Sequence, residues 1–454
     1  MVMQSTSDRL RSAEPGLPGQ ASAHERREQG LTRRIAIRIV PILWLASLMA
    51  YLDRVNVSFA ALSMNRALSL SSSAFGLGVG IFFAGSFLFS VPANTAFEKV
   101  GGRRWLAFLM VIWGALSMSM AFVHNAIEFQ FIRFLLGAAE AGFFPAMVLY
   151  LSYWLPQQAR VRCFALSMTA LPLSVVIGAP ISGLVLRTAT TGAFADWQWL
   201  FLIEGAPSVL LGVVAWTMLR DTPAVAEWLS REEREHILQS LAREDEARVE
   251  NIAPDGGGAM PIRILQLSVT MFCLNGVNYG ASFWLPQIVK ELGVSNLRTG
   301  MLLVIPSAAG VAAMLAWSML LAHRLRPQLG IALPILVAGT GLLGSTFATT
   351  PSPKIIWLTL ATMGIFATLP MVWSAPTALL PRSKAGTGVA IISMSGLGAG
   401  FLVPFLVGFV KDATSSFLPG FWILSALGFL AAVVAATLPF PPQSRSAQRQ
   451  GPRP

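Results

Sequence analysis

The chain contains about twelve apolar runs, each close to the roughly 20 residues that a helix needs to cross a bilayer, and no other feature constrains its fold as strongly. Lipid offers the backbone no hydrogen-bond partners, and the runs are too long for the strands of a membrane barrel, so each run must be a helix. Composition agrees, because 54% of the 454 residues are hydrophobic and only 12% are charged. The sequence therefore predicts an all-α membrane protein with twelve transmembrane helices. We expect these helices near residues 38–60, 74–96, 105–123, 128–152, 163–186, 197–219, 264–288, 299–321, 329–348, 355–379, 387–410 and 418–439.

The distribution of lysine and arginine predicts the orientation of the chain. If the N-terminus is cytoplasmic, the inner segments hold about 25 of the 33 basic residues and the outer segments hold about six. The net charge of +11 is therefore a topology signal rather than the footprint of a nucleic-acid-binding surface. We expect an integral protein of the inner cell membrane that has both termini in the cytoplasm and no nucleic-acid partner.

A polar segment after residue 219 divides the spans into six plus six. Within it, Ser230 and Glu233 form the pattern of a capping box, which predicts the start of a short amphipathic helix. The two ends of the chain are polar, which is typical of disorder. We therefore expect a disordered cytoplasmic tail (1–34), an N-terminal six-helix half (35–219), a cytoplasmic linker with the short helix (220–262), a C-terminal six-helix half (263–440) and a disordered cytoplasmic tail (441–454).

Charged residues inside the predicted spans all belong to the first half: Asp53, Arg54, Arg133, Glu140 and Glu204. A charge deep in the bilayer costs at least about 2.5 kcal/mol, so such residues face the bundle interior and tend to be functional. Residues seven apart on a helix lie on one face, about 10 Å apart, so Arg133 and Glu140 are expected to share one wall of a cavity. The alternative is a buried ion-pair network that only holds helices together. Glu204 is as consistent with a packing role as with a proton site.

Charge balance connects these residues to proton-coupled transport. Asp53, Arg54, Arg133 and Glu140 sum to zero when ionised, so a bound carboxylate leaves the site at minus one and a proton restores neutrality. Arginine stays ionised, so the proton must go to a carboxylate, whereas the guanidinium fork suits bidentate binding of the substrate. Two six-helix halves around a central linker are also typical of transporters whose site lies between the halves.

Several long motifs carry a family resemblance. The segments YLDRVNVSFAAL, EKVGGRRW, RFLLGAAEAGFFPAMVLYLSYWLP, DWQWLFLIEGAPSVLLG and YGASFWLPQIVK occur in order within residues 35–440. In these motifs the chain resembles the anion:cation symporter family of the major facilitator superfamily, which includes tartrate, phthalate, hydroxyphenylacetate and galactonate permeases. The resemblance implies a twelve-helix alternating-access carrier that imports an organic anion with protons, driven by the proton gradient and without a cofactor.

The resemblance also assigns roles to single residues. It implies that Asp53 and Glu140 are the proton-coupled acids, and that Arg54 and Arg133 contact the substrate carboxylate. Tyr51 matches an aromatic residue that lines the same pocket. Relatives in the family are generally thought to work as monomers, so we expect a monomer whose partners are a small organic anion, protons and membrane lipid.

The loop between the second and third spans resembles the conformational signature of the superfamily. Glu98 stands where aspartate is usual, and Lys99, Gly101, Arg103 and Arg104 match the signature. The resemblance implies gating at the inner face through charge pairing. The alternative is a loop that is basic only because it is cytoplasmic, which explains the basic residues but not Glu98.

Departures from the family pattern bear on the substrate. Ser86 stands where relatives often have tyrosine, and Ser393 and Leu397 stand where many carry asparagine. A site that binds many hydroxyls needs matched partners, because an unpaired buried polar group costs about 1 to 3 kcal/mol. We therefore expect an aromatic or otherwise weakly hydroxylated carboxylate rather than a sugar acid. Asn278, Tyr279 and Ser393 are the candidate contacts from the second half, although helix–helix hydrogen bonding would also explain them.

Other classes of function find little support in the sequence. Cys163 and Cys273 lie in or beside spans without disulfide or metal-ligand spacing, and no serine, histidine and acid group together as in a hydrolase. We expect neither an enzyme nor a metal protein. Three alternatives to import stay open: export of the anion, exchange of two solutes, and a membrane sensor of the same fold that binds a ligand without transporting it.

Overall fold

The computed structural model describes residues 18–188, 194–250, 260–321, 325–380 and 382–440, and within these ranges the chain forms helices and no β-strand. It has 12 helical segments long and apolar enough to cross a membrane. The predicted fold class, an all-α membrane protein with twelve spanning helices, is therefore confirmed. In chain order the elements are α1 (Pro18–Ala67), α2 (Ser72–Val100), α3 (Gly102–Ser119), η2 (Met120–Phe122), α4 (Ala126–Glu140), α5 (Phe143–Trp154), α6 (Gln157–Met168), α7 (Ala170–Thr188), α8 (Asp196–Met218), η3 (Pro223–Val225), α9 (Arg231–Glu250), α10 (Met260–Lys290), α11 (Asn296–Ala316), η4 (Trp317–Leu321), α12 (Pro327–Phe347), α13 (Pro351–Leu379), α14 (Arg382–Thr414) and α15 (Leu418–Ala436).

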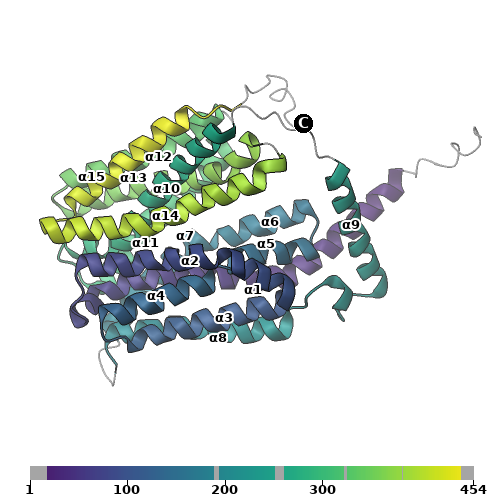
Figure 1. Ribbon diagram of the computed structural model, residues 1–454, viewed down its shortest axis with the longest axis horizontal. Coiled ribbons are helices and arrows are strands. Elements are labelled where there is room, and N and C mark those ends of the chain that lie inside the picture. Colours follow the sequence, from purple (N-terminus) through teal and green to yellow (C-terminus); the bar gives the residue numbers. More distant parts are fainter. Residues whose placement is uncertain (1–17, 189–193, 251–259, 322–324, 381, 441–454) are drawn as a thin grey trace, which may run out of the picture.

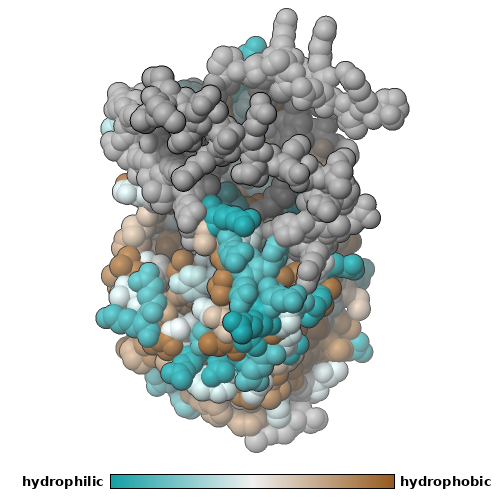
Figure 2. Space-filling view, turned by 90° about the vertical axis from the view of Figure 1, so that its right-hand side faces the viewer, coloured by the Kyte–Doolittle hydropathy of each residue, from teal (hydrophilic) through white to brown (hydrophobic). Residues whose placement is uncertain are grey.

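The spans form two bundles that lie side by side (Figure 1). Helices α1 to α8 supply the first six spans, and α10 to α15 supply the last six. Helix α9 stands at one end of the molecule, which we call the linker end, and the opposite end, where residues 68–71 join α1 to α2, is the far end. Figure 2 shows hydrophilic side chains gathered at the linker end. A polar end on a bundle with apolar flanks fits a protein that meets water at its two ends.

Two of the spans are broken next to a proline. The fourth span consists of α4 and α5, which meet at Ala141 and Gly142, and the fifth consists of α6 and α7, which meet at Thr169. Pro145 and Pro172 follow these breaks. Proline has no N–H and its ring clashes with the carbonyl four residues earlier, which weakens the helix at these two places, although other prolines, such as Pro180 inside α7, leave their helices continuous. The sequence predicted one uninterrupted run in each place, and the structure divides both.

Helix α1 begins well before the first span. The prediction of a disordered tail through residue 34 is wrong for residues 18–34, which are helical. The segment is rich in alanine, glutamine, glutamate and arginine, which favour a helix. A tertiary contact also holds it, because Arg34 forms a 2.6 Å ion pair with Glu233 of α9. The remaining parts of the predicted tails, 1–17 and 441–454, lie outside the described residues.

Helix α9 is the helix predicted in the linker, and it is longer than expected, spanning Arg231–Glu250. The capping box is present. The Glu233 carboxylate accepts from the N–H of Ser230 at 2.9 Å, and the Glu233 N–H donates to the Ser230 hydroxyl at 3.2 Å. The hydrogen bond from the Ser230 N–H lowers the pKa of Glu233, and the positive charge of Arg34 lowers it further. Glu244 forms a 3.0 Å ion pair with Arg160 of α6, so α9 is docked on the N-terminal bundle.

The two bundles touch at the far end, where small residues bring their backbones together. A Cβ at Gly76 of α2 would collide with the carbonyl of Pro404 in α14. In the same way, Gly300 of α11 faces the backbone of Ala179 in α7. Small residues at such crossings let membrane helices approach closely. The ribbons converge at this end and separate toward the linker end (Figure 1).

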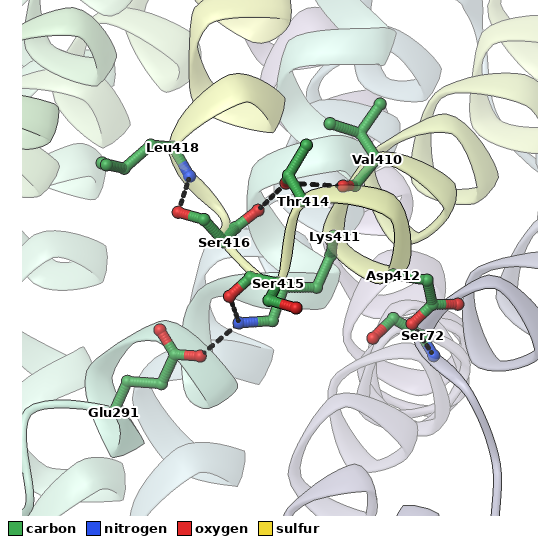
Figure 3. A network of polar contacts seen from close by, with 9 residues as sticks. All are labelled: Ser72, Glu291, Val410, Lys411, Asp412, Thr414, Ser415, Ser416 and Leu418. Atoms are coloured by element: carbon green, nitrogen blue, oxygen red, sulfur yellow. Dashed lines mark hydrogen bonds and ion pairs between the residues drawn. The ribbon is translucent and has the colours of Figure 1, made fainter.

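Asp412 of α14 fastens the two bundles together at the far end (Figure 3). Its carboxylate accepts from the N–H groups of Ser72 at 2.9 Å and Ser73 at 2.7 Å, and from the Ser73 hydroxyl at 2.5 Å. These N–H groups belong to the first turn of α2, where they lack intrahelical partners and attract negative charge. We call the contact of Asp412 with Ser72 and Ser73 the far-end latch. Beside it, Lys411 pairs at 2.7 Å with Glu291, which directly follows α10, so this ion pair lies within the C-terminal bundle.

Replacing Asp412 by asparagine should weaken the closure of the far end. The amide keeps the shape of the side chain but loses the charge, and the expected loss is about 1 kcal/mol because the carboxylate is largely exposed. That loss corresponds to a roughly fivefold shift toward states open at the far end. Spin labels on Arg66 and Ser352, in a chain whose two cysteines are replaced by serine, would report longer distances.

The matched control for this variant is Glu291→Gln, which removes the neighbouring ion pair within one bundle and should leave the distance distribution unchanged. A distribution in Asp412→Asn that equals that of the wild type would show that the latch does not set the closure of this end.

Candidate transport site

A cavity of about 90 Å³ lies between the two bundles. The N-terminal bundle contributes residues of α1 and α7, and the C-terminal bundle contributes residues of α10 to α13. The volume holds several water molecules, and transporters built from two repeats bind their substrates at such an interface. Most of the residues that line the cavity are apolar. The polar lining residues are Tyr51, Arg54, Ser58, Ser174, Asn278, Tyr279, Ser282, Ser307 and Thr362.

Arg54 brings a positive charge to the cavity wall, and this charge is paired. Its Nη2 lies 3.0 Å from Oε2 of Glu140, whose side chain is only 2% exposed, against 17% for Arg54. The guanidinium carbon also lies 5.2 Å from the centroid of the Tyr51 ring. Arg54 therefore reaches from the cavity to a carboxylate behind the wall. A second carboxylate in the cavity would compete with Glu140 for the same guanidinium.

Arg133 lies deeper than Arg54 and is 1% exposed. Its Nε donates to the carbonyl of Gly78 at 3.4 Å, and its Nη2 finds no hydrogen-bond partner among the described residues. The Phe82 ring contacts both arginines, with its centroid 4.7 Å from the guanidinium carbon of Arg133 and 5.1 Å from that of Arg54. Phe82 was not singled out in the sequence, where it is one of many phenylalanines in apolar runs. The open Nη2 leaves Arg133 with donors for an anion.

Asp53 points into the N-terminal bundle and is 3% exposed. Its Oδ1 accepts from the hydroxyl of Ser117 in α3 at 2.5 Å, and its Oδ2 is without a partner in the described part of the chain. The carboxyl is close enough to Glu140 and Arg133 for their charges to interact. Within the described ranges, no three His, Cys, Asp or Glu side chains come together in the manner of metal ligands.

The residues singled out in the sequence lie in different places: some line the cavity, others are buried in the N-terminal bundle behind its wall, and those of the predicted gate lie at the linker end. Neither Arg133 nor Glu140 lines the cavity, so the expectation that they share a cavity wall is wrong. The reason is packing, because Arg54 stands in front of Glu140 and Phe82 lies against Arg133. Ser393 of α14 is also not part of the lining. The singled-out residues that do line the cavity are Tyr51, Arg54, Asn278 and Tyr279.

Several hydroxyl groups of the lining are engaged by their own helices. They donate to carbonyl groups three or four residues earlier, so their O–H protons are already used and do not donate to a ligand in this state. Ser86 is engaged elsewhere, since it donates to the carbonyl of Gly137 at 3.0 Å and joins α2 to α4 outside the cavity. The lining hydroxyls concerned are those of Ser58, Ser174, Ser307 and Thr362.

The loop predicted to gate the linker end is tied to the segment after the sixth span. Gly101 has a φ of +91°, which favours glycine, and a Cβ there would press on Asp221. Oδ1 of Asp221 accepts from the N–H of Arg103 at 2.9 Å. Asp221 was not singled out in the sequence, although an acid directly after a span is a signal for such a contact. Three residues of the loop are exposed and make no ion pair with another described residue: Glu98, Lys99 and Arg104.

Comparison with known proteins identifies the family. The sequence pattern of the Major Facilitator Superfamily matches residues 43–404. A protein of Agrobacterium vitis named "Putative tartrate transporter" is 41% identical over 424 residues, which are 93% of this chain and 97% of that protein. A protein of Pseudomonas putida named "Putative metabolite transport protein NicT" is 34% identical over 414 residues, which are 90% of this chain and 95% of that protein. The inward open structure of the xylose transporter XylE from E. coli has a TM-score of 0.71 and 17% identity, and the match covers 90% of this chain and 97% of XylE.

The fold, the cavity between two bundles and these matches define a membrane transporter rather than an enzyme. The chain belongs to the Major Facilitator Superfamily. Its relatives support the resemblance to anion transporters of that superfamily that the motifs indicated. With its twelve apolar spans, it is an integral membrane protein.

The pairing of Arg54 with Glu140 predicts a non-additive effect on stability. Arg54→Gln or Glu140→Gln leaves one buried charge without its partner and should cost on the order of 3 kcal/mol, whereas the double variant removes both charges and should recover most of the loss. Thermal unfolding in detergent would measure this effect: both single variants should have lower melting temperatures than the wild type, and the double variant should have a melting temperature close to that of the wild type. The same cycle on the exposed pair Arg34 and Glu233 is the control, and each step there should cost about 1 kcal/mol or less. Additive losses at Arg54 and Glu140 would contradict the pairing.

Proposed function

We propose that this protein imports an organic carboxylate together with protons by alternating access. The observation that carries the proposal is the group of Asp53, Arg54, Arg133 and Glu140 beside the cavity, in which two guanidinium groups and two carboxyls are buried at a depth where unbalanced charge is costly. Such a group accepts an anion at low cost only if its own charge changes by one unit. A proton that binds to one of the carboxyls provides that change.

The mechanism follows from the ion pair between Arg54 and Glu140. A substrate carboxylate in the cavity takes the guanidinium of Arg54, and Glu140 loses the partner that compensates its buried charge. Glu140 is then neutralised by a proton. The open Nη2 of Arg133 becomes a second contact for the anion once Phe82 moves from its place against the two arginines. Asp53, close to both Glu140 and Arg133, serves as the second proton-coupled acid.

The cavity favours an aromatic or weakly hydroxylated carboxylate. Its lining is largely apolar, and Tyr279 and Phe283 present stacked rings with centroids 6.1 Å apart. The engaged serine and threonine hydroxyls leave few donors for the hydroxyl groups of a sugar acid. The second candidate is tartrate, because the relative from Agrobacterium vitis carries that name and Arg54 with Arg133 could bind two carboxylates.

The remaining features of the proposal concern topology and gating. We place α9 and both termini in the cytoplasm of a cell whose inner membrane holds the protein, on the basis of the positive-inside distribution of lysine and arginine. The state described is then closed to the outside. In this arrangement the residues Glu98, Lys99, Gly101, Arg103 and Arg104 belong to the inner gate, with Asp221 as the acid that holds the loop. The protein works as a monomer, needs no cofactor and is driven by the proton gradient.

Proton movement on addition of substrate tests this function. Cells that express the chain, suspended in a lightly buffered medium, should make the medium more alkaline when one acid of a panel is added, because protons enter with the anion. The panel contains benzoate, phthalate, 4-hydroxyphenylacetate, tartrate and galactonate. Arg133→Gln should abolish the response, and Arg162→Gln, which changes an exposed arginine, should leave it unchanged.

Each other outcome selects an alternative. An anion that leaves preloaded vesicles, or that moves only when a second solute moves in the opposite direction, would replace import by export or exchange. Binding of an acid without flux of either solute would indicate a sensor. A response to tartrate that exceeds those to the aromatic acids would overturn the preference for a weakly hydroxylated substrate.

Asp53→Asn tests the coupling itself. The variant cannot take up a proton at this position, so net uptake should lose its dependence on external pH, while exchange of labelled for unlabelled substrate continues because exchange needs no net proton movement. Reconstituted vesicles at a series of external pH values would measure both rates. An unchanged pH dependence of net uptake would remove Asp53 from the proposed mechanism.

A further inference from the structure

Glu204 is a buried carboxyl that the proposed transport cycle does not use. It lies on α8, is 8% exposed, and does not line the cavity. Its Oε1 accepts from the hydroxyl of Ser182 in α7 at 3.1 Å, whereas its Oε2 has no hydrogen-bond partner within the described ranges. An ionised carboxylate with one neutral partner in an apolar bundle is poorly compensated, so Glu204 is a group that holds a proton.

Other unpartnered polar atoms accompany Glu204 in the N-terminal bundle. Both side-chain polar atoms of Asn56, which is fully buried on α1, lack a partner in the described structure, and so does the hydroxyl of Ser208 on α8. Asn56 follows Asp53 by three residues and therefore lies on the same face of α1. The free Oδ2 of Asp53 completes the set. Buried polar atoms without protein partners mark places where bridging water is expected.

The buried polar groups lie at different depths in the N-terminal bundle, measured from the far end. Counted from the far end at about 1.5 Å per residue, Glu204 lies about 12 Å inside along α8, and Asp53 lies about 21 Å inside along α1. Glu204 is therefore between the far end and Asp53. The two carboxyls lie on α1 and α8, which pack against each other, and their charges interact. From the neighbouring helices, α7 presents Ser182 to Glu204, and α3 presents Met118 to the adjacent Gly205. Within the described ranges, Asp53 is the one charged group whose charge acts on Glu204.

We propose that Glu204 is a third proton-carrying carboxyl, which passes protons between the far end and Asp53 through the N-terminal bundle, outside the substrate cavity. The inference rests on the proposed proton coupling. In each transfer, a proton leaves the Glu204 carboxyl for the Asp53 carboxylate along bridging water, and Glu204 recovers a proton from water at the far end. Charge is conserved in both steps, and no other reactant is needed.

A separate route for protons has a clear physical advantage. The far end is closed by the contact of α2 with α14 in the state described, so the cavity offers protons no direct way from that side. A path inside the N-terminal bundle does not cross the interface between the bundles. Protons could therefore reach Asp53 while the two halves remain in contact at the far end.

The experiment compares net uptake with exchange in reconstituted vesicles that contain a pH-sensitive dye. The probe is whichever acid of the panel named above gives the largest response. Glu204→Gln should slow proton-driven net uptake about a hundredfold, the usual scale for losing a positioned proton-transfer group, and should keep exchange within about twofold of the wild type. Glu204→Asp, which keeps a carboxyl, should restore part of the net uptake. Glu227→Gln, which changes an exposed acid at the linker end, is the matched control and should behave as wild type.

The possible results separate this inference from the proposed function. If the wild type takes up protons with the acid and Glu204→Gln does so at the same rate, the relay is overturned and the symport stands. If Glu204→Gln loses exchange as well as net uptake, the residue supports the conformational change and the relay is again overturned. If the wild type moves no protons with any acid of the panel, the symport itself fails, and the relay fails with it.

Discussion

The cost of burying charge in an apolar bundle governs how the N-terminal half of this protein is built. Arg54 and Glu140 pair at 3.0 Å across α1 and α4, although Nε of Arg54 and Oε1 of Glu140 find no partner among the described residues. Asp53 and Arg133 are compensated only in part, by one hydroxyl, one carbonyl and an aromatic ring. The balance is therefore close to neutral but not rigid, and a single added charge disturbs all four groups together.

The two halves divide the work of recognising a ligand. Among the described residues, the charged groups beside the cavity come from the N-terminal half, and the C-terminal half supplies mostly apolar and aromatic walls, with Asn278, Tyr279, Ser282, Ser307 and Thr362 as its polar residues. Aromatic contacts join the two sides directly, since the Tyr279 ring lies 4.5 Å from that of Phe83 on α2. A ligand in the cavity would thus be held by charge on one side and by shape on the other, so its binding depends on how closely the halves approach.

The sequence predicted the parts of this architecture that depend on hydropathy and on charge. The twelve spans follow from apolar runs, and the buried charged residues stand out because charge is rare in such runs. The sequence did not predict which side chains of different helices contact one another. The spacing of Arg133 and Glu140 suggested a shared face, but it carries no information about Arg54, which approaches Glu140 from another helix. Phe82 has no local signature, because a contact between an aromatic ring and two arginines depends on tertiary packing.

The breaks in the fourth and fifth spans give the N-terminal half a means of bending. Each break lies more than halfway along its span from the far end, so the segments on the linker side, α5 and α6, are short helices joined to longer ones by irregular turns. Because α5 and α6 are consecutive in the chain, they form a hairpin with an interrupted helix at each root. A bend at these two breaks would move the hairpin at the linker end, while Glu140, the last residue of α4, stays on the far side of the break with Arg54.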